Sequence, residues 1–136
     1  MTEEIAEKYG IHFRDEIDDG EIDKSANSDL GHLDLLLFEC SLRDIDDDTD
    51  DMGLLSQIDE ALSNPDSEIH SGCGIVDILI YQDVVKFYVN DDIDEMPTAD
   101  FREIIAGWRE FLLTPPLNGT KIKLSLIDRF KKLFNK

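Results

Sequence analysis

Apolar residues recur every three or four positions in two segments of the chain, a spacing that predicts amphipathic helices over about 52–63 and 99–113. Asp51 is expected to cap the first helix and Thr98 the second, because their side-chain oxygens can accept hydrogen bonds from unpaired backbone N–H groups. The first apolar stripe consists of Leu54, Leu55, Ile58, Ala61 and Leu62. The second consists of Phe101, Ile104, Ile105, Trp108, Phe111 and Leu112. We interpret both stripes, including Trp108, as core surfaces rather than ligand sites.

Between the two helices the pattern changes to alternation. Residues 75–89 (IVDILIYQDVVKFYV) are rich in β-branched and aromatic side chains and predict a β-hairpin. Val76, Ile78 and Ile80 fall on one face of its first strand, as expected for a sheet that is covered on one side. The predicted fold class is therefore α+β, in which a small antiparallel sheet that includes the 75–89 hairpin packs against two or three helices.

The first half of the chain has weaker patterns. Residues 2–9 predict a short helix with Thr2 as its N-cap. Residues 14–29 are polar and are expected to form an exposed loop, and residues 90–95 are expected to form an acidic connection. Residues 30–42 (LGHLDLLLFECSL) fit both the helical and the alternating period. Of these two interpretations we favour a strand.

Charge adds a constraint on partners. The 136 residues include 32 Asp and Glu against 13 Lys and Arg, so the formal net charge is −19 and the pI is about 4.2. Residues 1–100 carry 29 acidic and 5 basic side chains, whereas residues 101–136 carry 3 acidic and 8 basic ones. This balance argues against binding nucleic acid through its phosphates and against docking on an anionic membrane. A basic partner fits the charge.

The length is typical of one domain, and we expect a single domain over residues 1–136. Its last part, 120–136, is a basic amphipathic segment that we expect to dock on the acidic body. No apolar run is long enough for a transmembrane helix and the first residues do not resemble a signal peptide, so a cytoplasmic location is expected. Cys40 and Cys73 are interpreted as small buried thiols.

Catalytic patterns are weak. The three histidines lack the spacing of paired metal ligands, and no phosphate-binding or dinucleotide-binding loop occurs. Residues 71–74 (SGCG) resemble a reactive-thiol loop but are interpreted as a turn before a strand. An EF-hand interpretation that begins at Asp48 fails, because Met52 stands at a ligand position and Asp59 stands where a bidentate Glu belongs. We therefore expect no enzymatic activity, no cofactor and no metal site.

Adjacent carboxylates gather in three polar segments, at 15–23, 44–51 and 90–95. Such clusters suit an electropositive protein surface, because complementary fields speed association and strengthen charge pairs that are desolvated on contact. Nucleic-acid-binding clefts of nucleases and DNA-binding proteins are surfaces of this kind. The residues predicted to contact the partner are Asp44, Asp46, Asp47, Asp48, Asp91 and Asp92.

Residues 52–113 resemble small bacterial immunity proteins of polymorphic toxin and contact-dependent growth inhibition systems. The resemblance rests on the Leu-rich helix, the hairpin and the run MPTADFREIIAGWREFL that follows it. It implies a protein without activity of its own that binds the C-terminal domain of a toxin, often a nuclease, and blocks the active site of that domain. The N-terminal half and the basic C-terminal segment lie outside the resemblance.

The resulting hypothesis is an immunity protein whose acidic loops block the basic substrate cleft of a cognate toxin domain, expected to be a nuclease. One alternative is an acidic DNA mimic or regulatory adaptor that sequesters a DNA-binding protein. Another is a calcium-dependent module, which a calorimetric titration with calcium tests. The gene neighbourhood separates the first two, since an immunity gene lies directly downstream of its toxin gene.

Overall fold

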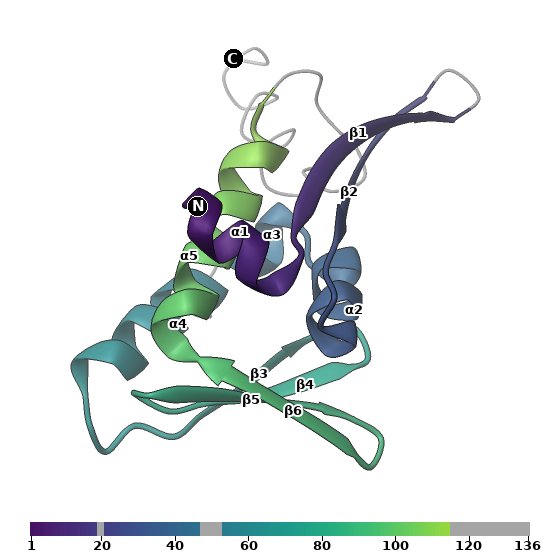
Figure 1. Ribbon diagram of the computed structural model, residues 1–136. Helices are drawn as coiled ribbons and strands as arrows, with labels where there is room; N and C mark the ends of the chain where they lie inside the picture. The colour runs from purple at the N-terminus through teal and green to yellow at the C-terminus, as the bar shows by residue number, and fades with distance from the viewer. Residues whose placement is uncertain (19–20, 47–52, 115–136) are drawn as a thin grey trace, which may run out of the picture.

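The computed structural model describes residues 1–18, 21–46 and 53–114. These residues form five helices and two antiparallel sheets, which confirms the predicted α+β class. In chain order the elements are α1 (Glu3–Tyr9), β1 (His12–Asp18), β2 (Glu21–Asn27), α2 (Gly31–Glu39), α3 (Leu42–Ile45), α4 (Leu54–Ser63), β3 (Ile69–Cys73), β4 (Val76–Ile80), β5 (Val84–Val89), β6 (Asp92–Pro97) and α5 (Thr98–Leu112). Figure 1 shows the helices above a four-stranded sheet, with the two-stranded sheet at the opposite end.

The larger sheet is a meander in the order β3-β4-β5-β6, and each neighbouring pair of strands is antiparallel. β4 and β5 confirm the predicted hairpin. The acidic connection expected at 90–95 is mostly wrong, because β6 begins at Asp92 and pairs with β5 along its length. Asn90, at φ 56°, lies in the tight turn between these two strands. A strand that carries only one buried side chain, Met96, has too little apolar alternation to be recognised from sequence.

The core lies between this sheet and the helices above it. Every second residue of β4 is buried, as predicted. The two predicted helices are confirmed as α4 and α5, and both contact the sheet. Phe101 of α5 packs edge-on against Phe87 of β5, with 5.3 Å between ring centroids. Trp108 is fully buried, which confirms its assignment to the core.

The loop expected at 14–29 is wrong for the described residues, because 14–18 belong to β1 and 21–27 form β2, and these two strands pair antiparallel. The polar sequence misled the prediction because the buried positions of this hairpin include only a small residue, Ala26, and a charged one, Lys24. Phe13 packs against α5, with its ring centroid 5.2 Å from that of Trp108. Lys24 is also buried there, and its Nζ lies 4.2 Å from the centroid of the Phe111 ring. Because a lysine occupies a buried position, the sequence of β2 does not show the alternation of apolar and polar residues that indicates a strand.

The strand favoured for residues 30–42 is also wrong, because this segment forms α2 and the start of α3. Leu33, Leu36 and Leu37, which share a helical face, are fully buried. Phe38, which belongs to the alternating pattern, is 65% exposed. α2 packs against β2 and also against strands β3, β4 and β5. The leucine-rich helix meets both sheets through its buried residues, and this packing decides between the two periods.

The predicted helix caps are confirmed at one position and wrong at another. Thr2 caps α1, since its Oγ1 accepts a hydrogen bond from the backbone N–H of Ile5 at 3.3 Å. Thr98 is the first residue of α5 rather than its cap, and its hydroxyl donates to the carbonyl of Tyr81 at 2.7 Å. The Thr98 hydroxyl therefore ties the helix to the sheet.

The start of α4 differs from the expectation in a similar way. Gly53 occupies its N-cap position. A Cβ atom on Gly53 would lie 2.4 Å from the backbone carbonyl carbon of Asp46, so the close approach requires glycine. Asp51, the expected cap, and the basic segment 120–136 lie outside the described residues. None of the helices that the structure describes is long and apolar enough to cross a membrane.

Candidate interaction surface

Two of the predicted contact residues belong to α3 and its C-cap: Asp44 lies within the helix and Asp46 follows it, and both have partners within the chain. The backbone N–H and the hydroxyl of Ser41 donate to Asp44 Oδ2, each at 2.9 Å, which completes a capping box. Asp46 accepts hydrogen bonds from Arg109 Nε at 2.6 Å and Nη2 at 3.3 Å, and this two-point ion pair joins α3 to α5. The hydrogen bond to Asp46 raises the pKa of Arg109 above its ordinary value. Asp47–Asp48 lie outside the described residues.

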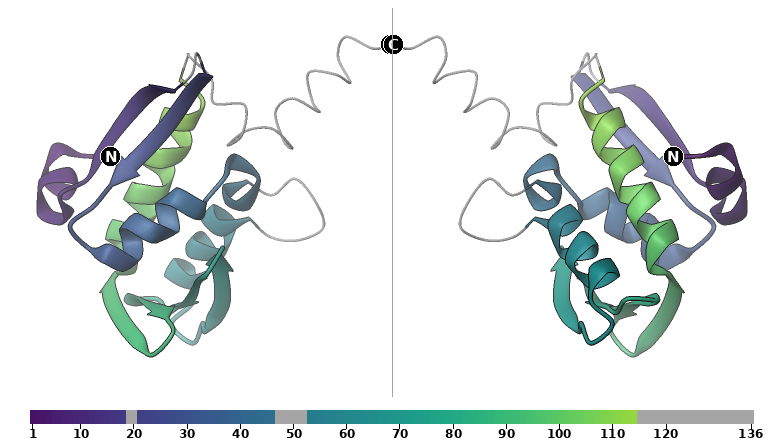
Figure 2. Two further views of the ribbon diagram at one scale, coloured as in Figure 1. Left: turned by 90° about the vertical axis from the view of Figure 1, so that its right-hand side faces the viewer. Right: turned by 90° about the vertical axis from the view of Figure 1, so that its left-hand side faces the viewer.

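Asp91 and Asp92 are exposed in and beside the turn between β5 and β6. His32 of α2 contacts this region: its Nε2 lies 3.3 Å from the carbonyl oxygen of Asp92, and its Nδ1 lies 2.6 Å from Asp94 Oδ2. Figures 1 and 2 show this turn at the lower end of the sheet, well below α3. The described members of the predicted acidic set therefore lie in two separate places.

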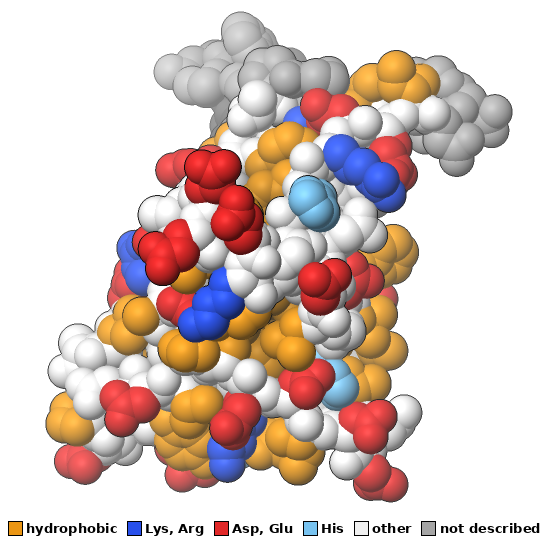
Figure 3. Space-filling model, in the orientation of Figure 1, with side chains coloured by type: hydrophobic (Ala, Val, Ile, Leu, Met, Phe, Trp, Pro, Cys, Tyr) orange, Lys and Arg blue, Asp and Glu red, His pale blue; other side chains and the backbone are white. Residues whose placement is uncertain are grey.

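The structure offers another candidate surface that the sequence reasoning missed. The helices cover one face of the four-stranded sheet, and no other described element covers the opposite face, which we call the open sheet face (Figure 1). Its apolar side chains, all half-buried or exposed, are Leu79, Tyr81, Val84, Tyr88 and Ile93. Ile93 is 58% exposed. In Figure 3 the lower end of the molecule shows hydrophobic side chains with acidic ones between and below them.

The pairing register of β4, β5 and β6 determines which residues are neighbours on the open sheet face. Tyr88 of β5 lies opposite Asp77 of β4 on one side and opposite Ile93 of β6 on the other. In the next row, Lys86 lies opposite Glu95. The exposed carboxylates at the border of this face or in the adjoining turns are Asp77, Asp83, Asp91, Asp92 and Glu95. The surface thus has an apolar centre with acidic residues around it.

A sequence signal for this surface does exist. Leu79 and Tyr88 occupy the strand positions that alternate with the buried core residues, and both are large and apolar. A sheet that faces water on one side usually carries polar residues at such positions. Apolar residues on both faces of a strand indicate that the second face is also covered, either by the fold or by a partner.

Carboxylates greatly outnumber cations over the part of the chain that the structure describes, with 26 Asp and Glu against 7 Lys and Arg. Five of these cations form ion pairs within the chain. The pairs are Lys8–Asp100, Arg14–Glu16, Lys24–Asp15, Arg102–Asp59 and Arg109–Asp46. Most carboxylates are therefore not neutralised by a Lys or Arg of the described chain, and the surface attracts cationic partners.

No protein-family model matches the chain, and neither a curated protein nor a solved structure matches it. The resemblance of residues 52–113 to immunity proteins accordingly stays a prediction.

Proposed function

We propose that this protein is a non-enzymatic immunity protein that binds a basic toxin domain in the bacterial cytoplasm and blocks its substrate cleft. The observation that carries the proposal is the open sheet face, an apolar centre bordered by carboxylates. A nuclease domain is the expected partner, because a cleft that binds nucleic acid phosphates is positively charged.

The open sheet face has the layout of a protein–protein contact. Specific interfaces combine a central apolar patch, in which aromatic residues contribute strongly, with a polar rim. Tyr88 and Ile93 supply the apolar centre, and both are accessible at the surface. The bordering carboxylates would steer a basic partner toward this face and pair with its cations.

The proposed contact differs from the one expected from the acidic loops alone. Asp91 lies in the turn beside the open sheet face and stays in the proposed contact as a rim residue. Asp92 adds negative charge near the same edge, although it alternates with Ile93 along β6 and so lies on the side of the strand that carries Met96. Asp46 is held by Arg109, and Asp44 by Ser41, so both already have roles in the fold. The apolar centre adds a hydrophobic contribution that carboxylates alone do not supply.

Co-expression with the toxin domain encoded by the neighbouring gene tests the proposal. We expect the full chain to restore growth and to co-purify with the toxin domain. Tyr88→Ala and Ile93→Ala should each weaken binding by about 1–2 kcal/mol, because each removes an apolar contact at the centre of the interface. Isothermal titration calorimetry measures this loss.

Ile17→Ala is the matched control, because Ile17 is 75% exposed but lies on β1, away from the larger sheet. It should leave the affinity unchanged. Toxicity that persists with the wild-type chain present would reject the immunity function. Equal effects of Ile17→Ala and Ile93→Ala would reject the open sheet face as the contact, even if the immunity function holds.

A DNA-mimicking adaptor is the second candidate, and the surplus of carboxylates favours it because such a surface also suits DNA-binding proteins. In that case the neighbouring toxin domain is not bound. A host DNA-binding protein is retained instead, and duplex DNA displaces it.

A further inference from the structure

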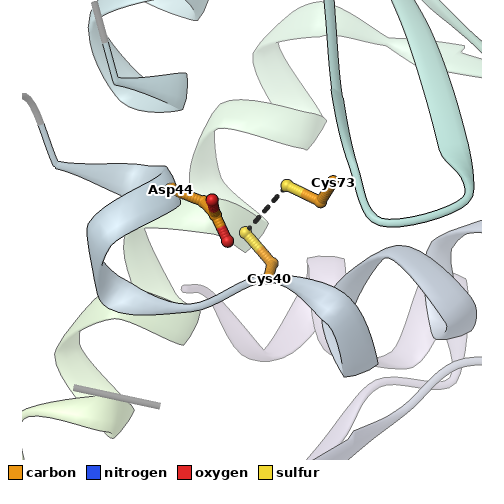
Figure 4. Close-up of side chains that lie close together, drawn as sticks. All are labelled: Cys40, Asp44 and Cys73. Atoms are coloured by element: carbon orange, nitrogen blue, oxygen red, sulfur yellow. Dashed lines mark hydrogen bonds between the residues drawn. The ribbon is translucent and has the colours of Figure 1, made fainter. Parts of the chain in front are cut away.

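Two cysteines and one aspartate converge where the α2–α3 junction meets the end of β3. Cys40 Sγ and Cys73 Sγ lie 3.3 Å apart. With one carboxylate oxygen of Asp44, the potential ligand atoms all lie within 4.8 Å of one another. Figure 4 shows the two thiol side chains pointing toward each other, with the Asp44 carboxylate beside Cys40. Among the described residues, this is the group of His, Cys, Asp and Glu side chains suited to hold a metal ion.

The surrounding structure holds these side chains in place. Cys40 is fully buried and Cys73 is 4% exposed, which confirms the prediction of buried thiols. Trp108 Nε1 donates to the carbonyl oxygen of Cys40 at 3.1 Å and anchors the backbone of the junction. Both Ser41 hydrogen bonds go to Asp44 Oδ2, which orients the carboxylate. Such supporting hydrogen bonds are typical around metal ligands.

We propose that Cys40, Asp44 and Cys73 form a binding site for a thiophilic divalent metal ion, Zn²⁺. Zinc binds thiolates at about 2.3 Å in a tetrahedral arrangement, which places two sulfur ligands about 3.8 Å apart. The observed 3.3 Å between the sulfurs requires only a small side-chain adjustment. The two thiols would each release a proton to solvent on binding, and water would complete the fourth position.

The presence of Asp44 favours a metal ion over a disulfide. A disulfide would use the two sulfurs alone, whereas a carboxylate next to two thiols completes a donor set of the kind that zinc accepts. Two sulfur donors also exclude calcium and magnesium, which prefer oxygen ligands. The bound ion would clamp the α2–α3 junction to the turn that follows β3. This site is separate from the open sheet face and does not depend on the proposed function.

Metal titration of the full-length chain tests the proposal. Reduced, metal-free protein is titrated with Zn²⁺ against a chromophoric chelator at physiological salt. We expect one Zn²⁺ per chain, protection of both thiols from Ellman's reagent, and a higher melting temperature. Co²⁺ serves as a second probe, because a thiolate-to-cobalt absorption band reports sulfur ligation directly in the wild-type chain.

Variants identify the ligands. Cys40→Ser and Cys73→Ser should each weaken Zn²⁺ binding by at least about 100-fold, since even outer-shell partners contribute about 10–100-fold. Asp44→Asn keeps an acceptor for Ser41 but removes the charge, and should weaken binding by about tenfold or more. Glu60→Gln, an exposed change on α4, is the matched control and should have no effect.

Three results would overturn the site. One is a wild-type chain that shows no thiolate-to-cobalt band. Another is Zn²⁺ affinity that survives the cysteine changes, which would assign the ion to surface carboxylates. The third is a reduced chain that retains no Zn²⁺ and oxidises in air to an intramolecular disulfide.

Discussion

At the scale of single residues, the fold places several charges beside the core and gives each a specific partner. Lys24 is 1% exposed, yet its Nζ donates to Asp15 Oδ1 at 2.6 Å and lies over the Phe111 ring. Its aliphatic stem fills space in the hairpin while the carboxylate and the ring compensate the ammonium. Tyr9 similarly reaches Asp100, which also binds Lys8 at 3.2 Å.

The Lys24–Asp15 pair leads to a first prediction. Asp15→Asn should lower the free energy of unfolding by about 1–3 kcal/mol, because it leaves a buried ammonium without its anion. Lys24→Met should cost less, since it removes the charge together with its desolvation penalty. Urea unfolding of both variants measures the two losses in the free energy of unfolding and shows which is larger. A larger loss for Lys24→Met would contradict this order and would show that the ammonium over the Phe111 ring contributes more than its desolvation costs.

Tyr9 leads to a prediction about pH. Burial, followed by the hydrogen bond to Asp100, raises the pKa of Tyr9 above its ordinary value of 10.0. A raised pKa in the folded state stabilises the fold below the unfolded-state value, and this contribution is lost as the pH rises through the folded-state value. The stability advantage of the wild type over Tyr9→Phe should therefore be complete at neutral pH and shrink above pH 10.0. Urea midpoints of both proteins across this range provide the measurement, and a constant difference would contradict it.

At the scale of elements, the β1–β2 hairpin depends most on its neighbours. An isolated two-stranded hairpin is at best marginally stable in water. This one is held against α5 by Phe13, whose ring stacks with Phe111 at 5.5 Å between centroids, and against α2 by β2. Its stability therefore comes from packing, which explains why its own sequence is mostly polar.

Phe13→Ala should release this hairpin without unfolding the larger sheet. We expect a loss of about 2–3 kcal/mol, less than for a fully buried phenylalanine, because Phe13 is only half-buried. Hydrogen exchange measured by mass spectrometry should show faster exchange in β1 and β2 and unchanged protection in β4 and β5. Ile17→Ala, at the exposed far end of β1, is the control and should change neither. Uniform loss of protection would show that the hairpin and the sheet unfold together.

Prediction of the elements from sequence succeeded where one period dominated. α4, α5 and the β4–β5 hairpin each carry a sustained apolar pattern, and all were predicted. α2 fits two periods, and β6 carries a single buried residue, so neither could be assigned from its own sequence. For the candidate surface, Asp91 and Asp92 were predicted, but the neighbouring Tyr88 and Ile93 were not, because strand register brings them together.

At the scale of the whole molecule, the two sheets lie at opposite ends of the helical layer, and the open sheet face forms one end (Figures 1 and 2). The acidic surplus is spread over the described chain, while the few cations are mostly used in ion pairs. Acidic residues therefore have two roles, internal pairing and external attraction. Asp46 illustrates the first role, and Asp91 and Asp92 illustrate the second.

This division predicts different effects of neutralising different carboxylates. Asp91→Asn combined with Asp92→Asn should slow association with the basic toxin domain and flatten its salt dependence, because rim charges act mainly on the on-rate. Asp46→Asn should instead lower stability by about 1–2 kcal/mol, since Arg109 loses its anionic partner. Stopped-flow association and urea unfolding measure the two effects. Slower association with Asp46→Asn at unchanged stability would contradict this division and would indicate that the toxin domain contacts the region of α3 instead.

The sequence by itself determined the α+β class, the helices α4 and α5, the β4–β5 hairpin, the acidic surplus and the burial of Trp108 and both cysteines. These properties follow from local periodicity, side-chain hydrophobicity and a count of charges. Only the tertiary structure decided that residues 30–42 form helices, that β1 and β2 pair, and that one sheet face stays open. It also brought the side chains of Cys40, Asp44 and Cys73 together. Each of these features depends on contacts between segments distant in the chain, and the energy of such contacts is absent from any local pattern.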